Sequence, residues 1–124
     1  MLKDKTSAAI VPCSNVAAAR RFYTETLGLP LAEDHGDVFA VQTGPSRLNV
    51  YKSDYAGTNK ANAVVWNAGA DVEAIAADLR AKGVTLDEYP DGFDDVRDGV
   101  HVKDDFRAIW FRDPDGNILH VISM

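Results

Sequence analysis

The chain has 124 residues, enough for one domain with a hydrophobic core and too few for two independent domains. Its composition, 46% hydrophobic and 26% charged, is typical of a globular protein. A net charge of −6, with no basic patch to offset it, argues against nucleic acid or an anionic membrane surface as the main partner. The single cysteine, Cys13, excludes an internal disulfide and a cysteine-rich zinc site.

From the sequence we expect neither a secretion signal nor a membrane-spanning segment. Its first residues, MLKDK, lack the apolar core of a signal peptide. No stretch approaches the roughly 18 consecutive apolar residues of a membrane-spanning helix. We therefore expect a cytoplasmic protein with no membrane partner.

The first half of the chain carries strand and helix signals in the order β-α-β-β-β. Residues 8–12 (AAIVP) read as a short strand. Asn15 then opens an apolar run with helical spacing, and Gly28 closes it, which predicts a helix of about three turns. Three strand-like runs follow, at 30–33, 37–42 and 47–51.

The second half repeats this order. A strand at 63–67 precedes a helical run that Asp71 opens and Gly83 closes. Strands are then predicted at 84–88, 106–111 and 117–122. The polar, acid-rich segment 91–105 makes this half longer. Its length and polarity indicate a surface loop, a kind of element that often covers a ligand site.

We therefore predict an α+β fold built from two βαβββ modules in tandem. Module one spans about 6–53, a polar linker about 54–61, and module two about 62–124, within a single domain of residues 1–124. Each module is expected to form a curved mixed sheet with its helix on one face. Two such sheets can face each other and enclose a cavity.

Three motifs in the sequence resemble those of a known family. They are RFYTETLGL at 21–29 after Asn15-Val16, DVEAIAADLRAKGV at 71–84, and WFRDPDGNI at 110–118. This pattern resembles the vicinal oxygen chelate superfamily, which includes glyoxalase I, extradiol dioxygenases and bleomycin-resistance proteins. The resemblance spans nearly the whole chain. It implies the glyoxalase/bleomycin resistance fold, but that fold serves both metalloenzymes and simple binders, so it does not specify the activity.

The resemblance also implies where a divalent metal would be held in metal-dependent members. Those positions lie on the first and last strands of each module, and here they hold Ala8, Asn49, Ala63 or Val64, and His120. A stable transition-metal site needs three or more His, Asp, Glu or Cys ligands. One histidine and one carboxamide fall short, and His35 and His101 lie on predicted loops. We therefore predict no metal and no other cofactor.

The candidate ligand contacts are polar and aromatic side chains expected to face the cavity. His120 alternates with Leu119 and Val121, so it faces inward if those two residues pack beneath the helix. It is then a ligand contact or a proton donor, with a structural histidine as the alternative. The predicted ligand-binding set is Asn49, Tyr51, Trp66, Asn67, His101, Trp110 and His120, with His120 as the candidate catalytic residue.

Two charged features leave alternatives open. The acidic side chains of 91–105 either attract a cationic ligand, as a bleomycin-sequestering protein requires, or are simply solvated. His101 within this segment is a candidate lid residue. Arg47 and Arg107 stand near strand starts and either pair with an anionic ligand group or lie in solvent.

The leading functional hypothesis is a metal-independent small-molecule-binding protein resembling bleomycin-resistance proteins. It would sequester or carry a ligand in a cavity near a homodimer interface, since the resemblance implies pairing with a second copy. The alternative is a glyoxalase-type lyase or isomerase, or a dioxygenase, with a metal recruited through His120. A third hypothesis is a metal-free enzyme that uses His120 as a general acid or base. The sequence names no substrate.

Overall fold

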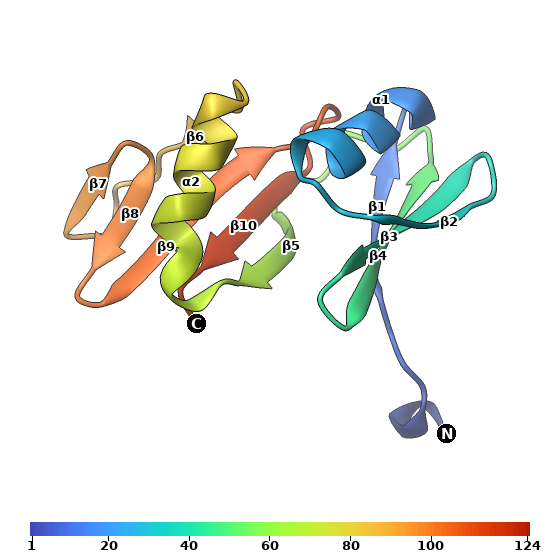
Figure 1. The fold of residues 1–124 in the computed structure, drawn as a ribbon, viewed down its shortest axis with the longest axis horizontal. Coiled ribbons are helices and arrows are strands. Elements are labelled where there is room, and N and C mark those ends of the chain that lie inside the picture. Colours follow the sequence, from blue (N-terminus) through green and yellow to red (C-terminus); the bar gives the residue numbers. More distant parts are fainter. The chain divides into compact units, whose positions relative to one another are not determined.

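Each half of the chain forms its own sheet, with a helix against one face of it (Figure 1). The computed structural model describes residues 1–124, which form two compact units. Unit one is Met1–Thr58 and unit two is Asn59–Met124, so the boundary lies within residues 54–61. The longest helix has 10 residues, and none is long and apolar enough to cross a membrane.

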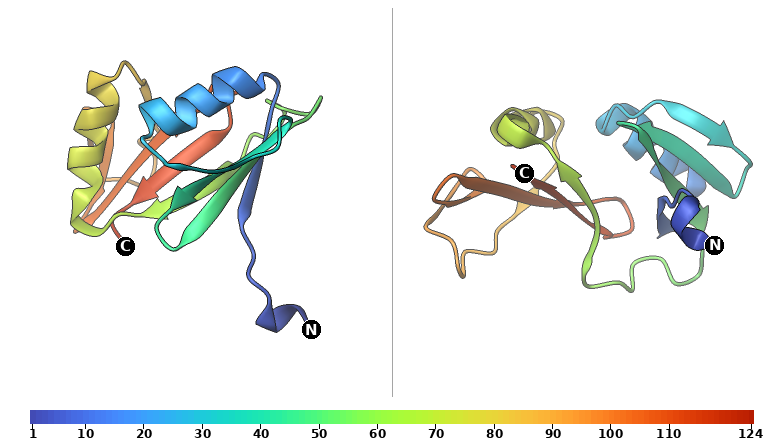
Figure 2. Two further views of the ribbon diagram at one scale, coloured as in Figure 1. Left: turned by 45° about the vertical axis from the view of Figure 1, so that its right-hand side comes forward. Right: turned by 90° about the horizontal axis from the view of Figure 1, so that it is seen from below.

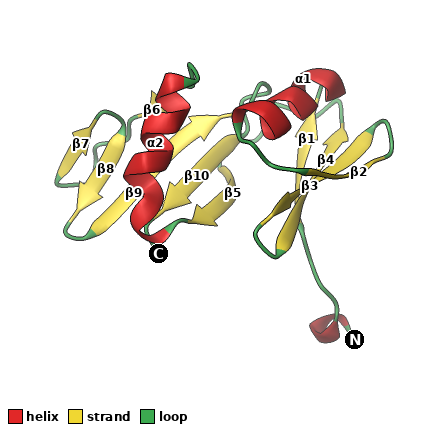
Figure 3. Ribbon diagram, viewed as in Figure 1, coloured by secondary structure: helices red, strands yellow, loops and turns green.

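Unit one is a four-stranded mixed sheet with the order β1-β4-β3-β2 (Figure 3). The first strand runs parallel to the last, and the other pairs are antiparallel. A short 3-10 turn at Leu2–Asp4 precedes the sheet. The other elements are β1 (Ala9–Cys13), α1 (Val16–Arg21), β2 (Leu31–Asp34), β3 (Val38–Thr43) and β4 (Ser46–Lys52).

The first helix begins and ends at the predicted residues. The Asn15 side chain accepts a hydrogen bond from the backbone N–H of Ala18 at 3.0 Å, as an N-cap does. Beyond α1 the helix continues as a π-helical turn at Phe22–Thr26. Gly28 follows with φ +69°, a conformation that glycine adopts without steric cost.

Unit two has the sheet order β5-β10-β9-β8-β7, with β6 also paired to β9. The strand β5 runs parallel to β10, and the other pairs are antiparallel. In the right-hand view of Figure 2, α2 covers one face of this sheet. The elements are β5 (Asn62–Asn67), α2 (Val72–Ala81), β6 (Leu86–Asp87), β7 (Asp95–Arg97), β8 (Val100–Lys103), β9 (Phe106–Arg112) and β10 (Ile118–Ile122).

The predicted cap of the second helix is wrong in its detail. The Asp71 side chain makes no capping hydrogen bond, and the chain enters α2 through a 3-10 turn at Gly69–Asp71. That turn continues directly into the helix, so Asp71 has φ −92° and ψ +1° and lacks the extended backbone of a side-chain cap. The helix still packs by its apolar positions, since Val72, Ala76 and Leu79 are buried.

The prediction of a surface loop at 91–105 is wrong, because the segment forms the β7–β8 hairpin. Val100, His101 and Val102 on β8 are buried. The hairpin turns at Asp98-Gly99, where both residues have positive φ (+51° and +85°). Asp-Gly is a strong signal for a two-residue hairpin turn. This turn signal was outweighed in the sequence by the many acidic residues of the segment, which favoured a solvated loop.

Strand register shows that the two sheets share one plan. In unit one Asn49 pairs with Ala40, and in unit two His120 pairs with Trp110. On its other side Ala40 pairs with Glu33 of β2, and Trp110 pairs with Asp87 of β6. The strand β6 therefore occupies in unit two the position that β2 occupies in unit one. The β7–β8 hairpin is the addition, and it pairs with the first residues of β9, which β6 leaves unpaired.

The core of each unit lies between its helix and its sheet. In unit two, Ile109, Phe111, Leu119 and Val121 are buried on the α2 side. Because strand side chains alternate between faces, His120 points to the face away from α2. The condition set in the sequence analysis, that Leu119 and Val121 pack beneath the helix, is therefore met. We call the face away from α2 the open face of the second sheet.

Candidate functional site

The open face of the second sheet carries most of the predicted site residues that lie in unit two. Along one row across the strands, His120 on β10 lies between Val65 on β5 and Trp110 on β9. Asp87 on β6 lies on the other side of Trp110. The five rings gathered on this face are referred to below as the ring cluster: Tyr89, Phe93, His101, Trp110 and His120.

Trp110 is the centre of the ring cluster. Its indole stacks on the His120 imidazole, with ring centroids 4.2 Å apart and planes 16° from parallel. Tyr89, Phe93 and His101 meet the indole at steep angles, with centroid distances of 5.3, 5.8 and 4.7 Å. The indole Nε1–H donates to the Asn62 Oδ1 at 3.2 Å. Stacking and this hydrogen bond together fix the orientation of the indole.

His120 is held in one tautomer. Its Nδ1 lies 3.0 Å from the carbonyl oxygen of Ile109, so Nδ1–H is the donor and Nε2 keeps its lone pair. Nε2 has no hydrogen-bond partner in the structure. Partial burial lowers the pKa of His120, and nearby His101 lowers it further, although the bond to Ile109 acts in the opposite direction. Near neutral pH, His120 therefore presents an acceptor nitrogen on the open face.

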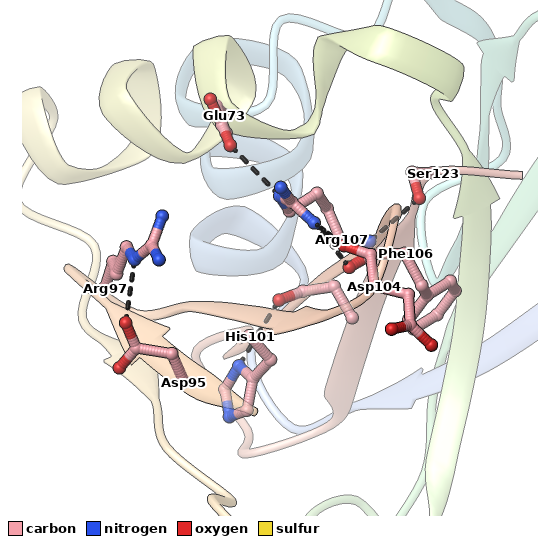
Figure 4. Close-up of polar contacts among 9 residues, drawn as sticks. Glu73, Asp95, Arg97, His101, Asp104, Phe106, Arg107 and Ser123 are labelled. Carbon is pink, nitrogen blue, oxygen red and sulfur yellow. Dashed lines mark hydrogen bonds and ion pairs between the residues drawn. The ribbon is translucent and has the colours of Figure 1, made fainter. Parts of the chain in front are cut away.

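His101 is not on a loop, so its predicted placement is wrong and it is not a lid residue. The side chain is fully buried on β8 and points away from α2, whereas Arg107 points toward that helix (Figure 4). Its Nε2 accepts from the backbone N–H of Tyr89 at 2.7 Å. Its Nδ1 lies 3.1 Å from the Gly99 carbonyl oxygen and 3.3 Å from that of Ala108. With both nitrogens occupied by backbone, His101 ties residues 88–105 to β9.

An ion pair borders the ring cluster. The Arg112 Nε donates to the Asp87 Oδ2 at 2.9 Å, and this carboxylate, with the Tyr89 hydroxyl, raises the pKa of Arg112. The Tyr89 hydroxyl lies 3.4 Å from the same carboxylate oxygen. Tyr89 therefore contacts both the indole of Trp110 and the Asp87–Arg112 pair, which places a fixed guanidinium beside the rings.

Both arginines singled out by the sequence pair with a carboxylate of their own unit, Arg107 partly buried and Arg47 exposed to solvent. Arg107 faces α2, where its Nε lies 3.3 Å from a Glu73 oxygen and its Nη1 donates to the carbonyls of Asp104 and Phe106 (Figure 4). Arg47, in unit one, donates to Glu33 at 2.9 Å. Their guanidinium groups stabilise contacts within each unit.

The remaining predicted residues fall in different places. Asn67 lies at the exposed end of β5, on the open face. Trp66 pairs with Val121, so it lies on the α2 side and not with His120. The apolar run at 63–66 hides the alternation that would have revealed this. Asn49 and Tyr51 belong to unit one, half-buried on the face away from α1.

Sequence reasoning missed several residues beside Trp110 and His120. Tyr89 and Phe93 follow β6, with Tyr89 just before the acid-rich segment 91–105 and Phe93 within it. Two aromatic residues in a polar stretch were the available signal. No signal in the sequence pointed to Asn62 or to the Asp87–Arg112 pair, because their roles depend on strand register.

The residues at the implied metal positions do not fit a divalent metal. Beside Asn49 on β4 lies Ile10, and beside His120 on β10 lies Val65. Ala8, Ala63 and Val64 offer no donor atom either. No group of three or more His, Cys, Asp or Glu side chains that could hold a metal ion is formed. One imidazole nitrogen and one carboxamide make a poor donor set for Zn, Mn, Ni or Fe.

Comparison with known proteins places the chain in a family. Residues 6–121 match the model of the Glyoxalase/Bleomycin resistance protein/Dioxygenase superfamily. Among solved structures, the fosfomycin resistance protein FosX from Listeria monocytogenes is similar at 11% identity and a TM-score of 0.75, over 96% of this chain and 92% of FosX. Lactoylglutathione lyase from Agrobacterium tumefaciens is similar at 16% identity and 0.70, over 96% and 92%. The oxidase ChaP-H2 is similar at 21% identity and 0.70, over 97% and 94%.

At such identities the solved structures show the fold alone, and they confirm the predicted α+β class. The family model, which covers almost the whole chain, establishes descent as well. The protein is therefore a member of the glyoxalase, bleomycin resistance protein and dioxygenase superfamily, also called the vicinal oxygen chelate superfamily.

Proposed function

We propose that this protein binds a planar, largely apolar small molecule against the ring cluster, without a metal ion. It would sequester or carry the ligand, as its resemblance to bleomycin-resistance proteins implies. The observation that carries the proposal is the Trp110–His120 stack, which leaves the His120 Nε2 available as a hydrogen-bond acceptor. An aromatic surface with one oriented polar atom is the usual composition of a small-molecule site.

The surroundings of the stack support the same proposal. Val65, beside His120, is 53% exposed and adds apolar surface to the row of rings. Trp110 and His120 are both half-buried, so part of each ring remains accessible. The structural neighbours include a resistance protein, a lyase and an oxidase. Because these neighbours do not agree on an activity, the proposal rests on the ring cluster.

The chain's two tryptophans allow a direct test, because they lie on opposite faces of the second sheet. Each indole N–H gives its own signal in a ¹H–¹⁵N spectrum, and the variants Trp66→Phe and Trp110→Phe assign the two signals. We expect 2-naphthamide, a neutral planar probe, to shift the Trp110 signal and leave the Trp66 signal in place. A shift of Trp66 alone, or of neither signal at saturating probe, would contradict the proposal.

Metal content tests the rival hypothesis of a glyoxalase-type enzyme. We expect the purified protein to bind 2-naphthamide equally well before and after treatment with a chelator, because no donor set fits a metal. About one equivalent of a transition metal per chain, combined with a change in probe binding on chelation, would refute the metal-independent proposal.

A second candidate function is favoured by the state of His120. A neutral imidazole with a fixed tautomer and an unpartnered Nε2 has the features of a general base. We therefore also propose that, if a reaction accompanies binding, His120 takes the proton. For any substrate that is found, His120→Ala should lower the turnover rate by about 10²-fold or more. An unchanged rate would eliminate this role.

A further inference from the structure

We propose that the ligand of the ring cluster carries a carboxylate or a similar planar anionic group, which the guanidinium of Arg112 binds end-on. This inference rests on the proposed function, since it assumes that the rings bind a planar molecule. It adds the chemical class of that molecule.

Arg112 lies at the right place for this contact. Arg112 and Trp110 are two residues apart on β9, so their side chains leave the same face of the sheet. Their Cα atoms are therefore about 7 Å apart. That separation suits a bicyclic aromatic acid, whose ring would lie on the rings while its carboxylate reaches the guanidinium.

The guanidinium is both fixed and available. Its Nε is engaged by Asp87, which sets the plane of the group, but neither Nη1 nor Nη2 takes part in an ion pair. The Arg112 side chain is 55% exposed, against 24% for Asp87, so the arginine and not the acid presents itself to a ligand. Two parallel N–H groups on a planar fork match the two oxygens of a carboxylate.

Tyr89 joins this guanidinium to the rings. Its ring meets the Trp110 indole at 5.3 Å, and its hydroxyl lies beside the carboxylate that holds Arg112. The rings and the cation therefore form one continuous surface within unit two.

The opposite charge preference is less well supported. Several acidic groups of 91–105 are already engaged: Asp95 pairs with Arg97 at 2.7 Å, and Asp94 accepts from the backbone of Asp104 at 2.9 Å. Neither carboxylate is directed at the rings by any contact, whereas Arg112 is placed beside them. Tighter binding of a cationic probe is accordingly one of the outcomes that the test can give, and it would contradict the inference.

Arg97 provides a matched control. It pairs with Asp95 through Nε alone, as Arg112 pairs with Asp87, and its Nη groups are likewise outside any ion pair (Figure 4). It lies on the other face, in a groove of about 260 Å³ that Glu73 and Arg80 also line. Its loss therefore removes the same charge from the same unit without touching the ring cluster.

The experiment compares three probes of one shape: 2-naphthoate, neutral 2-naphthamide and cationic 2-(aminomethyl)naphthalene. Dissociation constants are measured by calorimetry on the full chain. We expect naphthoate to bind about 1.5- to fivefold more tightly than naphthamide, the range for an exposed ion pair. Arg112→Gln should bring the ratio close to one, and Arg112→Glu should invert it. Arg97→Gln should leave it unchanged.

Each outcome has a separate meaning. If naphthamide binds at Trp110 but naphthoate has no advantage, or the cation binds best, the inference fails and the proposed function stands. If the naphthoate advantage survives Arg112→Gln, another group recognises the anion and the inference also fails. If none of the probes binds, the proposed function falls and the inference with it. Circular dichroism on each Arg112 variant excludes unfolding as the cause of a lost preference.

Discussion

At the residue scale, the environment of His120 determines its charge. Trp110 covers one side of its imidazole and the Ile109 carbonyl takes its Nδ1–H, while no carboxylate pairs with it. Removal from water disfavours the imidazolium, so the pKa lies below the ordinary value of 6.5. The ring is therefore neutral under conditions in which an exposed histidine is partly charged.

The neutral state of the His120 imidazole predicts that stability depends on pH. Because the folded pKa of His120 is depressed, the unfolded chain binds more protons below about pH 6.5, and the native state loses stability as pH falls through that region. Above about pH 6.5 the imidazole is mostly uncharged in both the folded and the unfolded chain, so the full stability is present. His120→Gln should therefore flatten the acid limb of a plot of unfolding free energy against pH.

The control is Asn67, an exposed residue of β5 that does not titrate. Asn67→Gln should leave the acid limb as steep as in the parent chain. Urea denaturation at a series of pH values between about 5 and 8 measures both effects. An acid limb in His120→Gln that matches the parent would show that burial of this ring does not govern its charge.

Asn62 is expected to orient the indole of Trp110. Asn62→Ala removes the 3.2 Å acceptor of the indole N–H, at a cost of about 0.5–1.5 kcal/mol in the free energy of unfolding. The Trp110 indole signal should shift and broaden as the ring gains freedom. Asn67→Ala, on the same strand but without a contact to the ring, is the control. Equal effects of the two variants would contradict the role of Asn62.

Alternation along strands decided which single residues could be placed from the sequence. It placed His120, Asn49 and Tyr51 correctly, because each alternates with aliphatic residues that pack beneath a helix. It failed for Trp66, which lies in an uninterrupted apolar run. Asn62 contacts a residue 48 positions away, a pairing that only strand register determines.

At the element scale, the β7–β8 hairpin depends on a glycine at its turn. Gly99 has φ +85°, and a Cβ placed on it would lie 2.6 Å from the Cβ of Leu86 on β6. The hairpin and β6 therefore approach more closely than any side chain at this position permits.

Gly99→Ala should destabilise the protein by about 2–5 kcal/mol, the sum of a positive-φ cost and an overpacking cost. Gly92→Ala is the matched control, because Gly92 has φ +86° with nothing within 4 Å of the added Cβ. It should show the backbone cost alone, about 1–2 kcal/mol. Urea titration separates the two. Equal losses would mean that Leu86 moves aside freely.

The two helix starts make a paired prediction. Asn15→Ala removes an observed capping bond and should cost about 1 kcal/mol. Asp71→Ala removes none and should change stability by less than about 0.5 kcal/mol. Thermal or urea unfolding of the two variants measures the difference. A larger loss for Asp71→Ala would show that this carboxylate stabilises the helix in another way.

Elements with strong local signals were predictable and the others were not. Both helices and the strands of the shared plan lie close to their predicted positions, since periodicity and glycine stops mark them. The β7–β8 hairpin was missed although Asp98-Gly99 carried its turn signal, because Asp91, Asp94 and Asp95 made the segment look solvated.

At the scale of the whole molecule, each sheet leaves apolar side chains exposed on the face away from its helix. Ile10 and Val38 in unit one are 59% and 40% exposed, and Val65 in unit two is 53% exposed. Covering such side chains is a reason for a chain to associate. The expected homodimer stays a prediction.

Light scattering coupled to size exclusion checks that prediction. We expect a mass of twice the 13.5 kDa chain, and a shift toward the single-chain mass in Ile10→Ser at low concentration. Lys3→Ser, an exposed substitution outside the sheet, should leave the mass unchanged. A parent chain that elutes at the single-chain mass at every concentration would rule out the homodimer.

The overall architecture was the most predictable level, because it repeats. The two modules carry the same order of signals, and one motif near each end of the chain identifies the family. The ring cluster was less predictable, since its rings come from four places in the sequence that only the sheet of unit two brings together.

The outer edge of β9 is divided between β6 and the β7–β8 hairpin. The hairpin takes a stretch of β9 that β6 does not occupy, so the frame that unit two shares with unit one is left intact. Tyr89, Phe93 and His101 all lie in the segment between β6 and β9 that contains the hairpin. Three of the five rings on this face therefore come from an addition to the shared frame, and their chemistry can differ without any change in the frame.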